Sequence, residues 1–442
     1  MAMDNQWRLL ARKNPLFLIG KLGCIGMCLG WLGLTVSGQN MEKDTPTATS
    51  SLNQALARAQ ALLTEDPDSS LSLARRVEAI GIKEALPLSE GLALRIQAQA
   101  HFALAQPDSA LTLFQQSATR LLVDSLEMLG LYQAIRTIAW EMLSSRLRSR
   151  AEPFFALALE LTQEPYLANY GPRAIADYGA CLISQGKLTQ GVDYLTEQRP
   201  FIEAARDTLN LIRNHLNLAL AYKRLGAYRE TLEQYQAALH LQSAAGEIED
   251  MMLTHNRRGR LYQDLGRFGQ ALNEYQQSQA LADSLGQPLA AADALSNLGT
   301  LYAKHGDYAE AWAYYQQAKL LYVHGLDSVR ISVHFIRLGN WHFLQGGLDS
   351  ASYWYQRSLN VETKLLRANG IATAYTNLGS VYARKRQFLR ALDYYEKAFD
   401  LQQANENRFE LPSLLINLAN LEYDLGRYAR AESHAQRGLR LA

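Results

Sequence analysis

The sequence predicts an all-α protein in which pairs of helices stack one after another into a solenoid. Two observations support this prediction. A pattern of small, aromatic and glycine residues recurs every forty residues, in six copies, between residues 211 and 442. The chain also combines 48% hydrophobic residues with only 11 prolines, a composition that suits helices. Repetition at this period is typical of solenoids, and we expect about ten helical pairs between residues 51 and 442.

Residues 1–38 differ from the rest of the chain and have the layout of a secretory signal peptide. Positive side chains precede an apolar run over residues 22–36, and small residues stand just before a cleavage site expected at Gln39. The alternative is a retained anchor over residues 16–36, about long enough to span a bilayer. We therefore expect an exported, periplasmic protein or, in the alternative, one anchored in the inner membrane. No later stretch of the sequence is expected to meet a membrane.

Residues 39–210 lie between the N-terminal apolar segment and the regular repeats. Residues 39–50 are predicted to be a disordered polar tail, and helices are expected from residue 51 onward. Residues 51–210 are predicted to hold degenerate repeats, since Asp68 and Asp108 stand forty residues apart, each after a proline suited to the first turn of a helix. Further prolines make the later part of this region the least regular, and we expect a bend or a longer connection there. These are Pro153, Pro165, Pro172 and Pro200.

Residues 211–442 form the regular array, and four sequence columns define it. A turn position, where glycine most easily takes a positive φ, is occupied by Gly226, Gly266, Gly306, Gly346, Arg386 and Gly426. Small residues of the first helix are Ala219, Gly259, Gly299, Gly339, Gly379 and Ala419. Small residues of the second helix are Thr231, Ala271, Ala311, Ala351, Ala391 and Ala431. A large ring on the second helix is Tyr235, Tyr275, Tyr315, Tyr355 and Tyr395. These columns predict close helix contacts filled by tyrosine.

This pattern resembles the tetratricopeptide repeat (TPR). The residues that carry the resemblance in the clearest copy are Leu298, Gly299, Tyr302, Gly306, Tyr308, Ala311, Tyr315 and Ala318. The usual repeat has about 34 residues, so a longer period implies longer helices, similar to those of Pins-type adaptors and of bacterial sensor and regulator proteins. The resemblance implies a right-handed superhelix in which first helices line the inner surface and second helices cover the outside.

Two residues depart from their columns. Arg386 occupies the turn position where its neighbours have glycine, so we expect strain that a glycine would relieve. Arg258 stands where the sister repeats have leucine. We expect its aliphatic stem to lie along the core with the guanidinium at the edge.

The last copy ends at Ala442 without a polar capping helix. Because an end repeat otherwise exposes a core face, we expect a partly bare surface there that is available for a contact. The residues concerned are Leu421, Tyr428, Leu439 and Leu441.

No catalytic, cofactor-binding or metal-binding motif is found, so the sequence predicts a protein without enzymatic activity or a cofactor. His334 and His342 are eight residues apart on one predicted helix, roughly 12 Å, which is too far to share a metal ion. Cys181 has no basic neighbour at a recognisable spacing and is predicted to be structural. The net charge of +1 gives no support for nucleic-acid binding.

Polar side chains form two columns on the predicted inner face. One residue before the column leucine stand Asn217, Arg257, Asn297, Arg337, Asn377 and Asn417. One turn further along the same face stand Arg260, Thr300, Asn340, Ser380 and Asn420, with Leu220 in the first copy. Asparagine can donate to and accept from a peptide backbone, and arginine can grip a carboxylate with two hydrogen bonds. The resemblance implies the same role, since such positions bind peptides in TPR proteins.

The wider face is basic through Lys304 and Arg384, and Phe343 offers an anchor for an apolar side chain. A local excess of positive charge favours an acidic partner. The alternative is that the asparagines bond only neighbouring helices and that the basic residues are a solvated surface. The sequence thus predicts an exported scaffold that binds an extended, acidic peptide or protein segment. The alternative function is a sensory input module of a bacterial signalling system, acting through a separate kinase or transcription factor.

Overall fold

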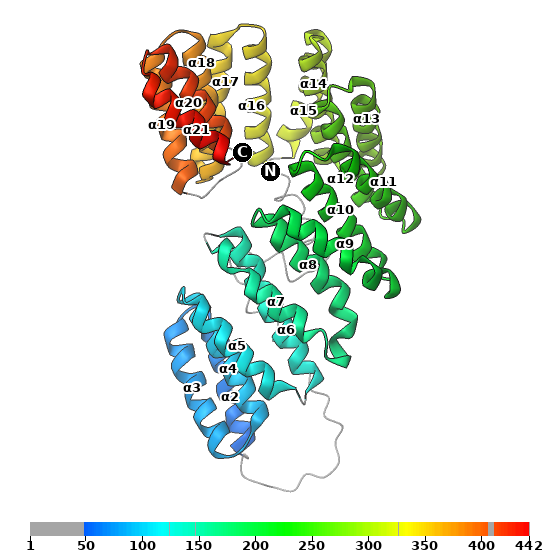
Figure 1. Cartoon of the computed structure of the whole chain (residues 1–442), viewed down its shortest axis with the longest axis vertical. Helices are drawn as coiled ribbons and strands as arrows, with labels where there is room; N and C mark the ends of the chain where they lie inside the picture. The colour runs from blue at the N-terminus through cyan, green and yellow to red at the C-terminus, as the bar shows by residue number, and fades with distance from the viewer. Residues whose placement is uncertain (1–47, 123, 146, 326, 405–410, 442) are drawn as a thin grey trace. The chain divides into compact units, whose positions relative to one another are not determined.

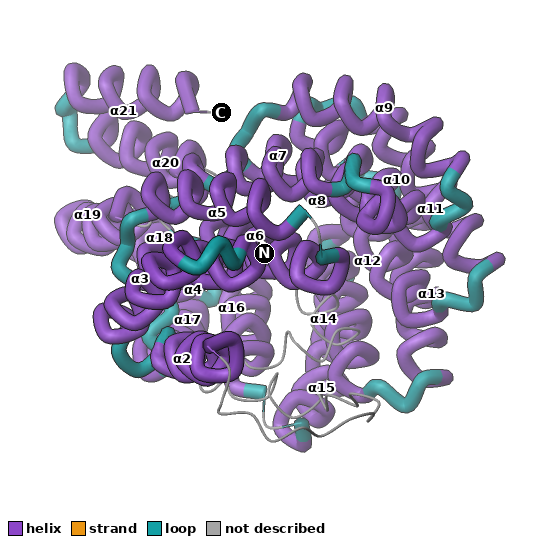
Figure 2. The backbone as a smooth tube through the Cα atoms, turned by 90° about the horizontal axis from the view of Figure 1, so that it is seen from below, coloured by secondary structure: helices purple, strands orange, loops and turns teal. Residues whose placement is uncertain are grey.

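The computed structural model describes residues 48–122, 124–145, 147–325, 327–404 and 411–441. These residues contain twenty α-helices and two short 3₁₀-helices. Figures 1 and 2 show helices joined by short loops, with no strand in the described part of the chain. The prediction of an all-α superhelical repeat fold with about ten helical pairs is confirmed. The predicted signal peptide lies outside the described residues. None of the helices described is both long and apolar enough to cross a bilayer.

The chain divides into two compact units, one ending at Asn210 and one beginning at Leu211. The helices of the first unit are α2 (Ala48–Leu62), α3 (Pro67–Lys83), α4 (Pro87–Ala103), α5 (Pro107–Leu121), α6 (Ser125–Ser144), α7 (Glu152–Leu161), α8 (Gly171–Ser184) and α9 (Leu188–Ala204). Two 3₁₀-helices, η2 (Arg148–Arg150) and η3 (Pro165–Tyr170), flank α7. Helices were expected from residue 51, but α2 begins at Ala48. The last three residues of the tail predicted over residues 39–50 are therefore helical.

Prolines mark helix starts in this unit, with one exception. Pro67 and Pro107 open α3 and α5 as expected, since the missing N–H of proline costs nothing in a first turn. Pro153 and Pro172 also lie in first turns, and Pro165 opens η3. Pro200, in contrast, lies inside α9, which continues to Ala204. The irregularity expected in this region comes from the two 3₁₀-helices and from the short α7.

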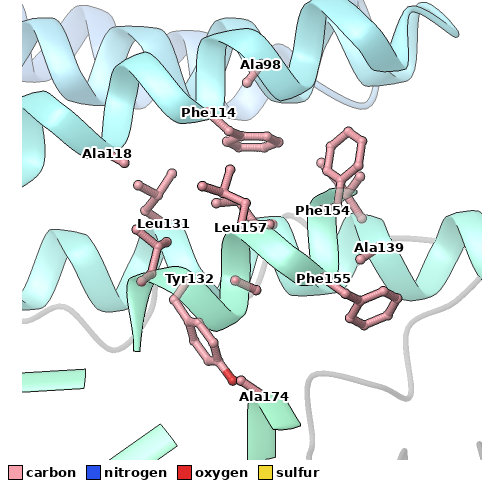
Figure 3. Close-up of a cluster of buried hydrophobic side chains, with 14 of the residues drawn as sticks. Ala98, Phe114, Ala118, Leu131, Tyr132, Ala139, Phe154, Phe155, Leu157 and Ala174 are labelled. Atoms are coloured by element: carbon pink, nitrogen blue, oxygen red, sulfur yellow. The ribbon is translucent and has the colours of Figure 1, made fainter. Parts of the chain in front are cut away.

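One hydrophobic cluster of the first unit lies mainly between α5, α6 and α7, and a second joins α2, α3 and α4. Phe114 and Phe154 meet edge to face with ring centroids 6.3 Å apart, and Leu131 is fully buried beside them, as Figure 3 shows. Cys181 is also buried, and burial raises the pKa of its thiol to about 12. This thiol is protonated at neutral pH and therefore unreactive, in agreement with the structural role predicted for it.

The second unit consists of six helical pairs with a uniform design. Its helices are α10 (Thr208–Arg224, whose first three residues fall before the boundary), α11 (Tyr228–Ala244), α12 (Ile248–Asp264), α13 (Phe268–Ser284), α14 (Pro288–His305), α15 (Tyr308–His324), α16 (Ser328–Leu344), α17 (Leu348–Lys364), α18 (Ala368–Arg384), α19 (Phe388–Ala404), α20 (Leu411–Asp424) and α21 (Tyr428–Leu441). Even-numbered helices are the first members of their pairs. Most helices have 17 residues, which with a three-residue turn makes half of the forty-residue period.

Left-handed residues end the helices, and they confirm the predicted turn column. All six positions of that column have a positive φ, from 58° at Arg386 to 102° at Gly306. The structure adds a second set halfway through the period, which includes Gly246, Gly286 and Leu366. The true spacing of these turns is therefore twenty residues, because first and second helices have the same length.

The small residues and the tyrosines also meet as predicted. A methyl group added at Gly299 would lie 2.8 Å from the ring of Tyr315, and one at Gly339 would lie 2.4 Å from the ring of Tyr355. These tyrosine side chains are 1% and 2% exposed. At these two positions glycine is therefore favoured, because the aromatic ring of the second helix occupies the space of a Cβ atom.

First helices of successive pairs contact each other directly. Examples are the contacts of α12 with α14, of α14 with α16, and of α18 with α20. They consequently line one common face of the second unit, called the inner face below. At the end of the array, Tyr428 and Leu439 are 64% and 77% exposed, as expected for an end repeat. Leu421 is only 2% exposed, contrary to expectation, because it packs on Tyr395 and Leu418 of the last two pairs.

Candidate functional site

The first polar column lies on the inner face, but its members differ in accessibility. Asn217 and Asn297 are buried, whereas Arg257, Arg337, Asn377 and Asn417 are half-buried. The first helices α10, α12, α14, α16, α18 and α20 supply one residue each. The column is therefore present in the structure, yet only part of it is open to a ligand.

Asn297 shows why burial matters. Its Nδ2 donates to Oδ1 of Asn256 on α12 at 2.8 Å, and its Oδ1 accepts from Nη2 of Arg337 on α16 at 2.8 Å. Both ends of this amide are thus used between neighbouring repeats. At this position the structure agrees with the alternative in which asparagine joins adjacent helices. Asn256, which sequence reasoning missed, stands one residue before its column and reaches the next repeat.

The second polar column serves the buried tyrosines. The hydroxyl of Thr300 lies 3.1 Å from that of Tyr315, and the hydroxyl of Ser380 lies 3.0 Å from that of Tyr395. Asn340 accepts a hydrogen bond of 2.6 Å from Tyr355 in the same way. A constant separation of fifteen residues marks this contact, and a buried phenol needs such a partner. These three side chains therefore support tyrosines, although Asn340 is itself exposed, as are Arg260 and Asn420 in the same column.

The remaining predicted residues include one close pair. Nη1 of Arg384 donates to the carbonyl oxygen of Phe343 at 2.8 Å, and the guanidinium lies 4.9 Å from the centre of the Phe343 ring. Arg384 therefore covers part of the expected apolar anchor. Lys304 is exposed and projects from the last turn of α14.

Several other charges on the inner face are neutralised by neighbouring repeats. Lys223 pairs with Asp264 at 3.2 Å, and Arg330 pairs with Asp293 at 3.0 Å. Asp293 also accepts a hydrogen bond of 2.7 Å from the hydroxyl of Tyr322. Asp264 and Asp293, two acidic residues of this face, are thus already paired with basic residues of the chain.

Among the described residues, Arg384 is bonded to Phe343 and has no carboxylate partner, and three further arginines of this face also lack one. We call Arg257, Arg260 and Arg337 the arginine group. Within the described residues none of the three forms an ion pair at 4.0 Å or less, and Nη1 of Arg337 is buried without an acceptor. Burial lowers the pKa of Arg257, with Tyr235 and Asp250 acting in the opposite sense. Burial raises the pKa of Tyr275, whereas both Arg260 and Arg337 lower it. Arg257 and Arg260 lie one turn apart on α12, and Arg337 lies on α16 of the same face.

Two residues that the sequence singled out, His334 and Arg258, have buried environments that it did not predict. His334 is 2% exposed and neither ring nitrogen has a partner; burial and the nearby Arg337 and Lys319 lower its pKa to about 3. Arg258 donates at 2.6 Å to Glu274, whose other carboxylate oxygen lies 2.8 Å from His255. The side chain of Arg258 is 14% exposed, so its guanidinium is more deeply placed than the edge position expected. No group of acidic, histidine or cysteine side chains suited to a metal ion occurs in the described part of the chain.

A family model described as tetratricopeptide repeat matches residues 250–319, 290–364 and 370–442. The matched part of the regular array therefore consists of tetratricopeptide repeats. TPR domains are protein-interaction folds, which supports binding of a protein or peptide in general terms. No curated protein matches the chain.

Solved structures similar to the chain include other TPR proteins. A tetratricopeptide repeat protein from Parabacteroides merdae is 17% identical, with a TM-score of 0.43, and covers 61% of this chain and 93% of its own. A signal-transduction ATPase with numerous domains and a TPR sensor, from Pyrococcus horikoshii, is 12% identical to this chain, with a TM-score of 0.46. The match covers 89% of this chain and 69% of the ATPase. The Cut9–Hcn1 hetero-tetramer of APC/C is 14% identical, with a TM-score of 0.42, 90% of this chain covered and 83% of its own.

Proposed function

We propose that this chain is an exported, non-catalytic scaffold whose second unit binds an extended acidic segment of a protein along its inner face. The observation that supports this proposal is the arginine group. Its three guanidinium groups lie on the inner face without carboxylate partners among the described residues, while Lys223 and Arg330 of the same face are already paired with aspartates. A carboxylate that arrives from a ligand would therefore gain charge-assisted hydrogen bonds without breaking an existing ion pair.

The proposal narrows the set of binding residues. Asn377 and Asn417 stay candidates because they are half-buried, and Asn420 and Lys304 because they are exposed. Thr300, Asn340 and Ser380 contribute mainly through the tyrosines that they support. Export rests on the sequence of residues 1–38, and the role as a sensory input module stays a prediction that no contact in the structure favours.

The experiment measures binding of a short peptide of alternating glutamate and alanine to the full chain by fluorescence anisotropy. The test variant replaces Arg257, Arg260 and Arg337 with glutamine. The matched control replaces three basic residues of second helices with glutamine, namely Arg229, Lys364 and Arg390, and so makes the same change in charge. A peptide of alternating glutamine and alanine controls for uncharged contacts.

We expect binding of the glutamate peptide to weaken at least tenfold in the test variant, equivalent to about 1.4 kcal/mol, and to stay within twofold in the control. Binding should also weaken with added salt, since the arginines are partly solvated. Equal losses in both variants would show that net charge alone attracts the peptide. The bound peptide can also be crosslinked to the chain. Crosslinks found only on second helices would place the peptide on the opposite face and refute the proposal.

A further inference from the structure

A second cluster of charged side chains lies in the first unit, between α6 and α8. Tyr132 and Arg136 stand one turn apart on α6, and Arg173 and Asp177 stand one turn apart on α8. Nε of Arg136 donates to Oδ2 of Asp177. The two side chains of this ion pair are 14% and 7% exposed, so the pair is largely shielded from water.

The charges of this cluster do not balance. Burial lowers the pKa of Arg136, but the Asp177 carboxylate more than offsets this and leaves that pKa raised. The pKa of Arg173 is lowered, first by burial and then by the positive charge of Arg136. Asp177 is the one carboxylate that acts on either arginine, and Arg173 forms no ion pair with any described residue. One positive charge is therefore left over in a half-buried place.

Two hydrogen-bond donors of the cluster are also unused. The hydroxyl of Tyr132 and Nε of Arg173 are buried and have no acceptor within the described structure. The side chain of Tyr132 is 2% exposed, and its ring lies against that of Tyr170 with centroids 5.4 Å apart. Figure 3 shows the hydroxyl directed toward Ala174 in the first turn of α8. A buried donor without an acceptor is costly, which indicates that something fills the position.

The start of α8 adds to the positive potential. No side chain caps this helix, since Tyr170 at the N-cap makes no side-chain hydrogen bond to the first turn. The first N–H groups of a helix carry partial positive charge and attract anions. In α8 the N–H of Gly171 already bonds to the carbonyl oxygen of Ala168 and Pro172 has no N–H, so this role falls to Arg173 and Ala174. The tyrosine hydroxyl, the arginine and the helix start therefore all favour the same kind of ligand, one that only accepts hydrogen bonds and carries negative charge.

We propose that Tyr132, Arg136 and Arg173, with the first turn of α8, form a binding site for a small oxyanion, either a carboxylate or a phosphate. A water molecule could accept from the two donors, but it would leave the extra positive charge uncompensated. An oxyanion satisfies both requirements at once. This site uses none of the residues of the arginine group, so it stands or falls independently of the proposed peptide binding.

The test compares thermal unfolding of the full chain in sodium chloride with unfolding in sodium phosphate, in sodium acetate, and in chloride with the glutamate–alanine peptide. Ionic strength and pH are held constant. We expect a saturable rise in Tm with phosphate or acetate. A rise with the peptide supports this site only where Arg173→Gln removes it, because the arginine group is proposed to bind the same peptide. A rise in Tm with phosphate alone assigns a phosphate site. A rise in Tm with acetate and with the peptide assigns a carboxylate site. Absence of a saturable rise in all three arms overturns the proposal.

Three variants locate the effect. Arg173→Gln should remove the ligand-dependent rise and also raise Tm in chloride, because it deletes the uncompensated charge. Arg136→Gln should lower Tm in chloride, because it leaves the Asp177 carboxylate buried alone. Tyr132→Phe should weaken the ligand effect with little change in chloride. If Arg173→Gln lowers Tm in chloride or keeps the ligand-dependent rise, the cluster is structural and the proposal is wrong.

A local measurement separates this site from the arginine group. Hydrogen exchange of the amides in the first turn of α8 should slow on addition of the ligand identified above. The same protection should persist when Arg257 and Arg260 are replaced by glutamine. Protection that disappears in that variant, or that never includes α8, would place the anion elsewhere and overturn the assignment.

Discussion

Replacing Arg386 with glycine should stabilise the protein, although it removes a long side chain from a helix end. Arg386 has φ 58° in the turn after α18, where all five other repeats of the array place glycine. Its side chain is exposed and forms no ion pair with any described residue. The substitution therefore loses no contact and acts through the backbone alone.

The magnitude follows from two opposing contributions. A left-handed conformation costs a non-glycine residue roughly 1–2 kcal/mol, and glycine gives back about 0.5–1 kcal/mol through the greater entropy of the unfolded chain. The net gain is on the order of 0.5–1 kcal/mol. For a unit that runs from Leu211 to Ala442, this corresponds to a rise in Tm of about 2 °C.

The assay is thermal and urea unfolding of the full chain, with the reverse substitution as a matched control. Gly266 holds the same position after α12 with φ 69°, and an added Cβ would meet no atom within 4 Å. Gly266→Arg should therefore destabilise by a similar amount without any clash. The reasoning is refuted if Arg386→Gly lowers Tm, or if Gly266→Arg leaves Tm unchanged.

Three further predictions concern the packing and the buried polar groups of the second unit. Gly339→Ala should destabilise by about 1–3 kcal/mol in urea unfolding, because the new methyl group overlaps a tyrosine ring. Gly269→Ala in α13, where a Cβ meets nothing within 4 Å, should instead be neutral or stabilising by up to about 1 kcal/mol, and equal losses in both would contradict the explanation. His334 has a folded pKa of about 3, below its ordinary value of 6.5, so the unfolded state takes up the proton first as pH falls. Its contribution to stability is complete above pH 6.5 and is lost toward pH 3 at about 1.4 kcal/mol per pH unit. His334→Phe should flatten urea-derived stability over that range, and an unchanged pH profile would show that the histidine is hydrated. Arg258→Leu should cost about 3 kcal/mol because Glu274 is left buried, and adding Glu274→Gln should recover most of the loss in the same assay. Failure of the second change to recover stability would show that the arginine acts through packing.

Much of the fold could be predicted from the sequence. The turn column, the small-residue columns and the tyrosine column all took the places expected of them, with Arg386 as informative as the glycines. Each of these features depends on a local backbone conformation or on a contact within one helical pair. Such requirements repeat with the sequence period, so they can be read without knowing how successive pairs are arranged.

The candidate site was predicted less completely. The sequence placed the polar columns on the first helices, but it did not show that Asn297 is already bonded on both sides or that Thr300, Asn340 and Ser380 hold tyrosine hydroxyls. Those partners are single side-chain atoms, and polar atoms pair only when distance and angle are both right. The position of a residue in a column predicts the helix face on which it lies. It does not predict which atoms its side chain contacts.

The sequence by itself determined the repeat: helix pairs of fixed length, turns that need a positive φ, and close contacts that exclude a Cβ atom. Only the tertiary structure decided which charges stay uncompensated. The arginine group and the excess charge beside Asp177 arise because the crossing of helices about forty residues apart brings some carboxylates to arginines and leaves others out of reach. Charge balance is a property of that three-dimensional arrangement, and a chain with a net charge of +1 does not reveal it.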